Sequence, residues 1–333
     1  MAGVTANSFA QASDTVLTLL AGLHLSESTV LRTTENAGQR VGQLLADGHR
    51  LGFPDHFSWH CDATGRTCAY ISIDATGVRQ QAADGGPAES RMPYVALVFN
   101  PIPDLPDDSP YAPSPKAESQ ARYLSGLYDL GELGTQLRRQ GGQVGMNQAE
   151  QWIALTDGGA GLEDFVKKNF PGHDLVAILD FWHAAEYLGG LAAVLHPNDE
   201  AARTAQFEAW RQRLQDAGGE AMVAHLEAFA WPLRRPAVRE KLAEVLRYFG
   251  NNVHRMDYPR YLASGWQIGS GAVESGCKTV VGQRLKLAGM RWRESGTDAV
   301  CHLRALFRSG PAQWEAFWKR TVQTSRVNAC STN

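Results

Sequence analysis

The segment CAYISIDATGV, residues 68–78, decides the fold of this chain. Within it, Ile71 and Ile73 alternate with Ser72 and Asp74. This period of two predicts a strand with one buried face. A carboxylate at the end of a buried strand is costly unless something positive meets it. The segment therefore predicts a core strand whose terminal acid, Asp74, needs a positively charged partner.

Two other segments, far away in the sequence, set a carboxylate beside glycine or an aromatic residue at the end of an apolar run. They are QWIALTDGGAGLEDFVKKNFPGHDLVAILDFWH (residues 151–183), with Asp157, and GSGAVESGCKTVVGQRLKLAGMRW (residues 269–292), with Glu274. Hard divalent cations take oxygen ligands, so convergence of the three acids would create a cation site. Such a site performs phosphoryl transfer on nucleic acids. The predicted function depends on whether Asp74, Asp157 and Glu274 meet in space.

Each of the three acids also has an ordinary explanation. Asp74 and Asp157 each begin a turn-like sequence, DATG and DGG. Glu274 can pair with Lys278 four residues later on a helix surface, which is worth only a few tenths of a kcal/mol. Two unit charges about 4 Å apart repel by about 4 kcal/mol at an effective dielectric of about 20. Without metal, three converging carboxylates would therefore keep a proton or stay apart.

The order of the remaining patterns predicts a mixed α/β sheet. After the first strand, MPYVALVFN (92–100) and ARYLSGLY (121–128) read as strands around a Pro- and Asp-rich loop at 101–115. DLGELGTQLRRQ (129–140) reads as a helix. WIALTD (152–157) and DLVAILD (174–180) then read as short strands separated by the helix GLEDFVKKNF. Strands that alternate with helices indicate an α/β fold.

Helices are predicted on both sides of this core. Residues 182–263 are almost wholly helical in pattern, and Glu274 follows on a helix opened by the Gly-Ser-Gly of residues 269–271. Residues 8–48 read as two helices, with Ser26 as the N-cap of the second. These two resemble a helix-turn-helix with a DNA-reading second helix, and a plain helical hairpin is the alternative.

The bulk properties favour a cytoplasmic protein with a localised basic surface. No apolar run approaches the length that spans a membrane, and MAGVTANSFAQASDTV lacks the features of a secretory signal. The net charge is −3, but residues 241–333 hold 14 Lys and Arg against 6 Asp and Glu. Residues 1–240 hold 18 and 29, respectively. This asymmetry indicates a polyanion-binding surface in the last quarter of the chain.

The cysteines fit reduced thiols better than a disulfide framework. There are five of them, an odd number with scattered spacing. His56, His60, Cys61 and Cys68 cluster in sequence, so a zinc site is conceivable. The gap between the two cysteines does not match a zinc-ribbon spacing. A group of soft ligands with no metal role is the favoured interpretation.

Three strands, a helix, two strands and a helical block before the last acid are the order of a ribonuclease-H-like core. We therefore expect a mixed five-stranded sheet with flanking helices and a helical insertion before Glu274. The expected divisions are a helical N-terminal segment (1–60), a core (61–183 plus 264–310), a helical insertion (184–263), and a C-terminal helix and tail (311–333).

With these motifs in this order, the chain resembles bacterial insertion-sequence transposases of the DDE type, near the Kra-type group and the Mutator-like lineage. The resemblance covers residues 20–320. It lies in Asp74 of ISIDATG, Asp157 of LTDGG, Asp180 and His183 of LDFWHAAEYL as a Cys/Asp-x-x-His signature, and Glu274 of GSGAVES before RLKLAGMRW. Relatives usually carry a longer DNA-binding region before the core than the roughly 60 residues here, which leaves a shortened copy as an alternative.

The resemblance implies a role for each motif residue. Asp74, Asp157 and Glu274 would ligate two Mg²⁺ ions, with Mn²⁺ as an alternative and Asp74 as the bridging ligand. Asp180 and His183 would support the site. Their ordinary explanations are a helix N-cap at Asp180 and a surface pair between His183 and Glu186.

The string after Glu274 suggests contact with DNA. Its cations, together with Trp292, would contact phosphates and stack on a base, or they would form a solvated basic helix face. The residues concerned are Lys278, Arg284, Lys286, Arg291, Trp292 and Arg293.

The sequence thus favours a transposase that binds terminal inverted repeats, cleaves the strand and joins it to target DNA. The resemblance further implies a homo-oligomer that acts at the nucleoid. A metal-dependent nuclease with the same acids and an inactive or domesticated DNA-binding derivative are the alternatives.

Overall fold

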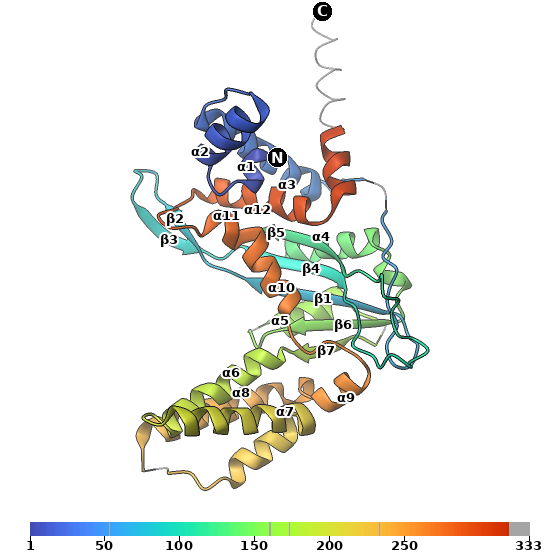
Figure 1. Ribbon diagram of the computed structural model, residues 1–333, viewed down its shortest axis with the longest axis vertical. Helices are drawn as coiled ribbons and strands as arrows, with labels where there is room; N and C mark the ends of the chain where they lie inside the picture. Colours follow the sequence, from blue (N-terminus) through green and yellow to red (C-terminus); the bar gives the residue numbers. More distant parts are fainter. Residues whose placement is uncertain (53, 160, 173, 233, 320–333) are drawn as a thin grey trace, which may run out of the picture.

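The protein is a mixed α/β structure with a central sheet between two groups of helices (Figure 1). The structure, a computed structural model, describes residues 1–319 except 53, 160, 173 and 233. The predicted tail from residue 320 onward lies outside the described residues. Among those described, no helix combines the length and apolarity required to cross a membrane.

The sheet has five strands in the order β5-β4-β1-β6-β7. They are β1 (Cys68–Ala75), β4 (Tyr94–Asn100), β5 (Gln120–Gly126), β6 (Gln151–Thr156) and β7 (Val176–Leu179). β4 is antiparallel to both β1 and β5, whereas β6 is parallel to both β1 and β7. The prediction of a mixed five-stranded α/β sheet with flanking helices is confirmed, and this arrangement is compatible with a ribonuclease-H-like fold.

The alternation in β1 sends its side chains to two different cores. Ile71 and Ile73 join a cluster with α4 (Leu130–Gln143) and α5 (Leu162–Asn169). Tyr70 joins the other cluster, on the same side of the strand as Ser72 and Asp74. That cluster contains α6 (Phe181–Leu195), α10 (Gly271–Gly276) and part of α12 (Glu294–Arg308). Asp74 therefore lies on the face of the sheet covered by α6, which begins directly after Asp180, and by α10, which contains Glu274.

The predicted helical insertion is a separate lobe beyond β7 (Figure 1). It comprises α6, α7 (Glu200–Ala228), α8 (Pro236–Asn252), the short η3 (Val253–Arg255) and α9 (Tyr258–Ala263). The long helix expected around residues 200–228 is kinked. Gly218 has a φ of 77°, a left-handed conformation that favours glycine, and the amide of Gly219 donates to the Met256 carbonyl at 2.9 Å.

The N-terminal helices pack on α12 rather than standing apart from the core. They are α1 (Ala2–Thr5), α2 (Phe9–Gln11), the π-helical η1 (Ala12–Leu20) and α3 (Glu27–Ala46). Ser26 caps α3 through the amide of Thr29, as predicted. Gly38 lies against the backbone of Ala299, where a Cβ would collide. One face of the proposed DNA-reading helix is therefore buried in the protein, and DNA reading by α3 stays a prediction.

A second, two-stranded sheet follows β1 and was not expected. It consists of β2 (Val78–Gln81) and β3 (Pro87–Arg91). Residues near Trp292 extend this hairpin, because the Trp292 amide donates to Arg79 at 3.0 Å and the Gln81 amide donates to Trp292 at 2.7 Å. The remaining elements are η2 (Met146–Gln148), η4 (Cys277–Gly282) and α11 (Gln283–Leu285), and residues 311–319 are helical.

A candidate active site at the carboxyl edge of the sheet

Three aspartates end three neighbouring parallel strands. β1 and β6 pair Ser72 with Leu155, and β6 and β7 pair Thr156 with Leu179. Continuing both registers past the strand ends sets Asp74 beside Asp157 and Asp157 beside Asp180. Neighbouring strands lie about 4.8 Å apart, so this row gathers three carboxylates at one edge.

Asp74 is held from two directions. Its Oδ1 accepts the amide of Ala75 at 2.6 Å, and its Oδ2 accepts the thiol of Cys277 at 3.4 Å. Burial and the nearby Asp74 raise the pKa of the Cys277 thiol, which keeps this donor protonated. Cys277 follows α10 directly, so the contact brings the helix of Glu274 to the end of β1.

Glu274 lies over the same face of the sheet as Asp74. Ser270 connects it to Asp180, the third aspartate of the row. The single proton of the Ser270 hydroxyl lies within reach of two carboxylates, that of Asp180 and that of Glu274, whose Oε1 is 3.3 Å away. The carboxylate also lies 3.9 Å from the ammonium of Lys278, as its ordinary explanation predicted. α10 can approach the sheet because Gly276 has no side chain; a Cβ there would lie 3.1 Å from Val95.

Asp180 is buried and acts as the N-cap of α6. Its Oδ1 accepts the amides of Trp182 at 2.7 Å and His183 at 3.3 Å, and its Oδ2 accepts the amide of Ser270 at 3.1 Å. The predicted N-cap is therefore confirmed. His183 pairs with Glu186 at 3.7 Å, which confirms that expectation as well. Asp180 ties the start of α6 to the loop before α10, consistent with a supporting role.

Asp157 follows β6, and a residue of the helical lobe contacts the end of this strand. Its Oδ1 accepts the amide of Gly159 at 2.9 Å. The buried guanidinium of Arg255 donates to the hydroxyl of Thr156 at 3.0 Å and lies 3.3 Å from Glu163. Arg255 therefore connects the lobe to β6 at the residue immediately before Asp157.

Aromatic side chains of the lobe border the same edge. Tyr248 packs so closely on Gly158 that a Cβ there would collide with it. Tyr248 also stacks on Tyr187, with ring centroids 3.8 Å apart. Trp182, two residues after Asp180, is 52% exposed, and the guanidinium of Arg211 lies 5.7 Å from its ring centroid. An exposed indole beside buried acids is a surface on which a planar ligand can stack.

The donor chemistry of this edge suits Mg²⁺, which binds one or two carboxylates together with water and substrate phosphates. Asp74 and Asp157 are partly exposed, as ligands must be. In the side-chain arrangement of the described residues, however, no three His, Cys, Asp or Glu side chains lie close enough to hold one ion. The three-acid metal site thus stays a prediction.

The structure corrects two of the residues predicted to contact DNA. Arg284 is fully buried, and Trp292 is 7% exposed. The guanidinium of Arg284 lies over the rings of both Phe9 and Trp292, with centroids at 4.2 and 5.1 Å, and its Nε donates to the Gly3 carbonyl. Burial lowers the pKa of Arg284 to about 10. Phosphate contact by Arg284 and base stacking by Trp292 were therefore wrong expectations.

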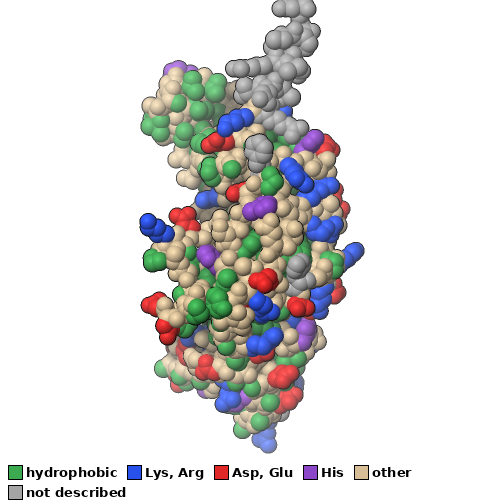
Figure 2. Space-filling view, turned by 90° about the vertical axis from the view of Figure 1, so that its right-hand side faces the viewer, with side chains coloured by type: hydrophobic (Ala, Val, Ile, Leu, Met, Phe, Trp, Pro, Cys, Tyr) green, Lys and Arg blue, Asp and Glu red, His purple; other side chains and the backbone are tan. Residues whose placement is uncertain are grey.

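The other four predicted cations are exposed: Lys278, Lys286, Arg291 and Arg293. Two of them lie beside the acids: the ammonium of Lys278 is 3.9 Å from Glu274, and that of Lys286 donates to the hydroxyl of Thr76, two residues after Asp74, at 2.9 Å. The charge asymmetry of the sequence overstated the basic surface, because Arg255, Arg284 and Arg304 are buried. On the face shown in Figure 2, blue and red side chains are interspersed rather than segregated.

The histidine and cysteine cluster does not form a zinc site among the described residues. Burial raises the pKa of Cys68 to about 12, and its thiol donates to the Arg66 carbonyl at 3.4 Å. His56 is hydrogen-bonded to Gln148. Cys61 and Cys68 are free thiols in the structure.

No model of a known protein family and no curated protein matches the chain. The assignment of the candidate site therefore depends on the geometry of the site alone. Sequence reasoning missed five residues that build it, because their roles come from contacts between distant segments: Trp182, Tyr248, Arg255, Ser270 and Cys277.

Proposed function

We propose that the chain is a DNA phosphoryl transferase with a ribonuclease-H-like core, and specifically a DDE transposase. One observation carries the proposal: the strand register sets Asp74 beside Asp157, while the Cys277 contact brings the helix of Glu274 to Asp74. Acids from a sheet edge and from a returning helix thereby share one neighbourhood. The reaction class, DNA cleavage and strand transfer, comes from the resemblance of the sequence motifs to those of DDE transposases.

In this proposal, Asp74 and Asp157 hold Mg²⁺ or Mn²⁺ together with Glu274. When bound, two such ions activate the attacking water or 3′-hydroxyl and stabilise the leaving oxygen. Other residues of the chain position these acids: Ser270 and Lys278 orient Glu274, and Arg255 holds the end of β6. Lys278 and Lys286 are exposed cations beside these acids, and in this proposal they contact phosphates next to the scissile bond.

The substrate of the proposed reaction is duplex DNA that carries the terminal inverted repeats of an insertion sequence, with a second duplex as target. Trp182 provides a stacking surface for a base near the cleaved bond. Pairing of two ends needs more than one subunit, so a homo-oligomer that acts on nucleoid DNA is part of the proposal.

The test combines a pre-cut end, taken from the sequence that flanks the gene, with a supercoiled plasmid and Mg²⁺ or Mn²⁺. We expect joined products from the wild type and a loss of at least about a thousandfold in Asp74→Asn, Asp157→Asn and Glu274→Gln, because each removes charge that acts on the transition state. Asp107→Asn, in the exposed loop after β4, is the matched control and should retain activity.

The outcomes separate the alternatives. Metal-dependent nicking without joining would indicate a nuclease with the same acids. DNA binding with neither reaction would indicate a non-catalytic derivative. Full activity in Glu274→Gln would contradict the site itself.

A further inference from the structure

Four leucines at the junction between η1 and α3 are exposed to solvent. They are Leu19, Leu20, Leu23 and Leu25, with exposed fractions between 44% and 79%. Hydrophobic side chains gather on the projection at the upper left of Figure 2, at the level where Figure 1 places the N-terminal helices. We call these four side chains the leucine surface. A concentration of exposed apolar side chains marks an interaction site on a folded protein.

Hydrogen bonds fix the backbone beneath the leucine surface. The Leu23 amide donates to the Leu17 carbonyl at 2.8 Å, and the Ser13 hydroxyl donates to the Leu25 carbonyl at 2.5 Å. Gly22 makes the turn after η1 with a φ of 66°, the left-handed conformation typical of a helix end. These bonds fold the residues after η1 back along the helix, so the four leucines are displayed together.

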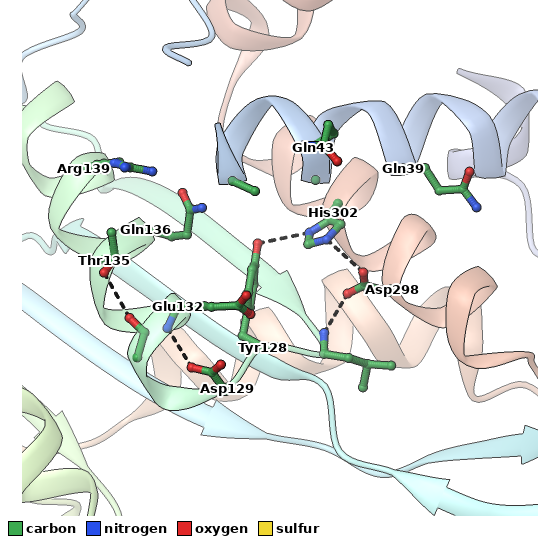
Figure 3. Close-up of a pocket in the computed structure, with 14 residues that line it drawn as sticks. Gln39, Gln43, Tyr128, Asp129, Glu132, Thr135, Gln136, Arg139, Asp298 and His302 are labelled. Atoms are coloured by element: carbon green, nitrogen blue, oxygen red, sulfur yellow. Dashed lines mark hydrogen bonds and ion pairs between the residues drawn. The ribbon is translucent and has the colours of Figure 1, made fainter. Parts of the chain in front are cut away.

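The helices that carry the leucine surface are anchored on the core. η1 packs against α1 and α3, and the Val4 carbonyl of α1 accepts a hydrogen bond from the buried Arg304 of α12. α3 approaches α12 so closely that a Cβ on Gly42 would lie 2.6 Å from the ring of His302. Figure 3 shows His302 beneath α3, with its ring hydrogen-bonded to Tyr128 at 3.1 Å. A partner bound to the leucine surface would therefore have a defined position relative to the core.

The composition of this segment favours an uncharged, apolar partner. Residues 15–26 contain no Asp, Glu, Lys or Arg. Binding of DNA depends on cations that neutralise its phosphates, so this segment does not suit DNA. Burial against a second apolar surface is what removes leucine side chains from water.

The surface that matches the leucine surface best is the same surface on a second copy of the chain. Ile102 and Trp182 line one groove, but Gln120 and Gln267 share it, and Trp182 is there the proposed stacking surface for a base. In an isologous contact, one patch meets itself across a twofold axis. The remaining exposed large hydrophobic side chains of the described residues are distributed over the chain: Met1, Met92, Tyr111, Leu130 and Leu262.

The end of the chain is a poor alternative occupant by composition. Residues 320–333 contain no Leu, Ile, Met, Phe, Trp or Tyr. Covering four leucines requires large apolar side chains, which that segment lacks.

The area of the leucine surface predicts the strength of the contact. At about 30 Å² for each CH₂-sized group, the exposed parts of the four leucines amount to roughly 300 Å² per copy. Two copies would then bury roughly 600 Å² of apolar surface, in the range below about 1,200 Å² that is typical of weak, transient interfaces. We therefore expect a dimer that depends on protein concentration.

We propose that the leucine surface joins two copies of this chain in a weak dimer with twofold symmetry. The proposal deepens the proposed function and rests on it in one respect, namely that a reaction which pairs two DNA ends needs two subunits. The dimer itself forms without DNA. Binding of two copies to neighbouring DNA ends raises their effective concentration, so a weak contact is sufficient to pair them.

The first test measures association of the full chain by sedimentation velocity, without DNA. We expect half of the wild type to be dimeric at about 10–100 µM. Leu19→Glu/Leu20→Glu should weaken association at least about a hundredfold, because like charges then face each other across the axis. Met92→Glu, the same change at an exposed position outside the leucine surface, is the matched control and should dimerise like the wild type.

Folding of the double variant is checked separately. Because Leu19 and Leu20 are exposed, thermal unfolding monitored by circular dichroism should match that of the wild type. A wild type that stays monomeric over this concentration range, an unchanged dimer in Leu19→Glu/Leu20→Glu, or oligomers that grow beyond two copies would each overturn the proposal. Binding of a monomeric wild type to phosphatidylcholine vesicles would overturn it as well, in favour of a lipid surface.

The second test examines the twofold symmetry with single cysteines. A residue near a twofold axis lies opposite its own copy, so at least one of Leu19→Cys, Leu20→Cys and Leu23→Cys should form a disulfide-linked dimer with glutathione disulfide as the oxidant. Met92→Cys is the matched control for random collision, since Met92 and Leu23 are both 54% exposed. Linkage no greater than in this control for all three variants would contradict the symmetric contact.

The third test separates the dimer from the proposed reaction. Leu19→Glu/Leu20→Glu should reduce joining of DNA ends at least about tenfold and still bind a single end, because its avidity is lost. Asp74→Asn should dimerise like the wild type. Dimerisation without cleavage or joining of DNA would reject the proposed function and retain the dimer. Joining at the wild-type rate by the double variant would reject the leucine surface as the subunit contact and retain the proposed function.

Discussion

At the scale of single residues, a buried acid and a partly exposed acid of this chain differ in the number of donors that surround them. Asp62 is 1% exposed and accepts from the Thr64 amide, the Thr64 hydroxyl and the Arg66 amide at 2.8, 2.7 and 3.1 Å. The indole of Trp266 donates to it at 3.3 Å. By contrast, Asp157 Oδ2 has no donor among the described residues. Asp62 therefore stabilises the fold, whereas Asp157 keeps an oxygen for a ligand.

Asp62→Asn should lower the free energy of unfolding by about 2 kcal/mol at pH 7, because hydrogen bonds to a charged group are worth about 1.5–3 kcal/mol. Burial opposes ionisation of Asp62, but its hydrogen bonds outweigh burial and lower its pKa below the ordinary 3.8. The contribution is complete above the unfolded pKa and is lost as the pH falls through the folded pKa. Urea unfolding of both proteins should show a difference that shrinks below about pH 4; a constant difference would contradict this account.

Trp182 is the residue that we propose to stack on a base of the substrate DNA. Trp182→Ala should weaken binding of DNA about tenfold, because one stack on an aromatic side chain is worth about 1–3 kcal/mol. Since the indole is 52% exposed, thermal stability should change little. Fluorescence anisotropy with labelled DNA measures the effect, and Trp182→Phe is the control that retains a ring. Unaltered affinity in the alanine variant would exclude this stacking surface.

At the scale of elements, α3 illustrates how a glycine can determine packing. Gly38 permits the close approach of α3 to α12 at Ala299. Gly42, one turn later, faces His302, where a Cβ would lie 2.6 Å from the ring. The two glycines together allow α3 to pack closely against α12.

Gly38→Ala should destabilise the protein by about 1–3 kcal/mol, because the added methyl group overpacks a helix interface. Gly250, in α8, is the matched control, since a Cβ there meets nothing within 4 Å. Gly250→Ala should stabilise by about 0.5–1 kcal/mol, as expected for a helix interior. Chemical denaturation would compare the two variants, and equal effects of the same sign would refute the close contact between α3 and α12.

At the scale of the whole molecule, the basic surface is smaller than the net charge of the last quarter of the chain suggests. Buried arginines serve packing: Arg284 and Arg304 donate to the carbonyls of Gly3 and Val4, and Arg255 holds the end of β6. The cations that remain for phosphates after the last acid lie around α10 and the segment before α12. Binding of DNA should therefore depend on few contacts.

If Lys278, Lys286, Arg291 and Arg293 neutralise four phosphates, log K should fall against log salt with a slope of about −3.6. Lys286→Ala should reduce the magnitude of the slope by about 0.9, because one phosphate contact is lost. Lys116→Ala, in the loop between β4 and β5, serves as the control and should leave the slope unchanged. A slope near zero for the wild type would exclude this surface as a DNA contact.

The sequence by itself determined the sheet, because each predicted strand carries its period of two or its apolar run within a few residues. It also determined that Asp74 and Asp157 lie at the ends of strands, whereas the pairing of β1 with β6 in the structure makes those strands neighbours. The caps at Ser26 and Asp180 were likewise local. In all these features, the physical cause lies between residues close in the chain.

Only the tertiary structure decided which charged and aromatic residues reach the surface. The string RLKLAGMRW has the composition of a basic loop, yet the β2–β3 hairpin and the N-terminal helices enclose Arg284 and Trp292. The contacts of Cys277 with Asp74, of Ser270 with Asp180 and of Arg255 with Thr156 join segments far apart in the chain. The identity of a side chain does not say which distant element will cover it, and packing alone settles that.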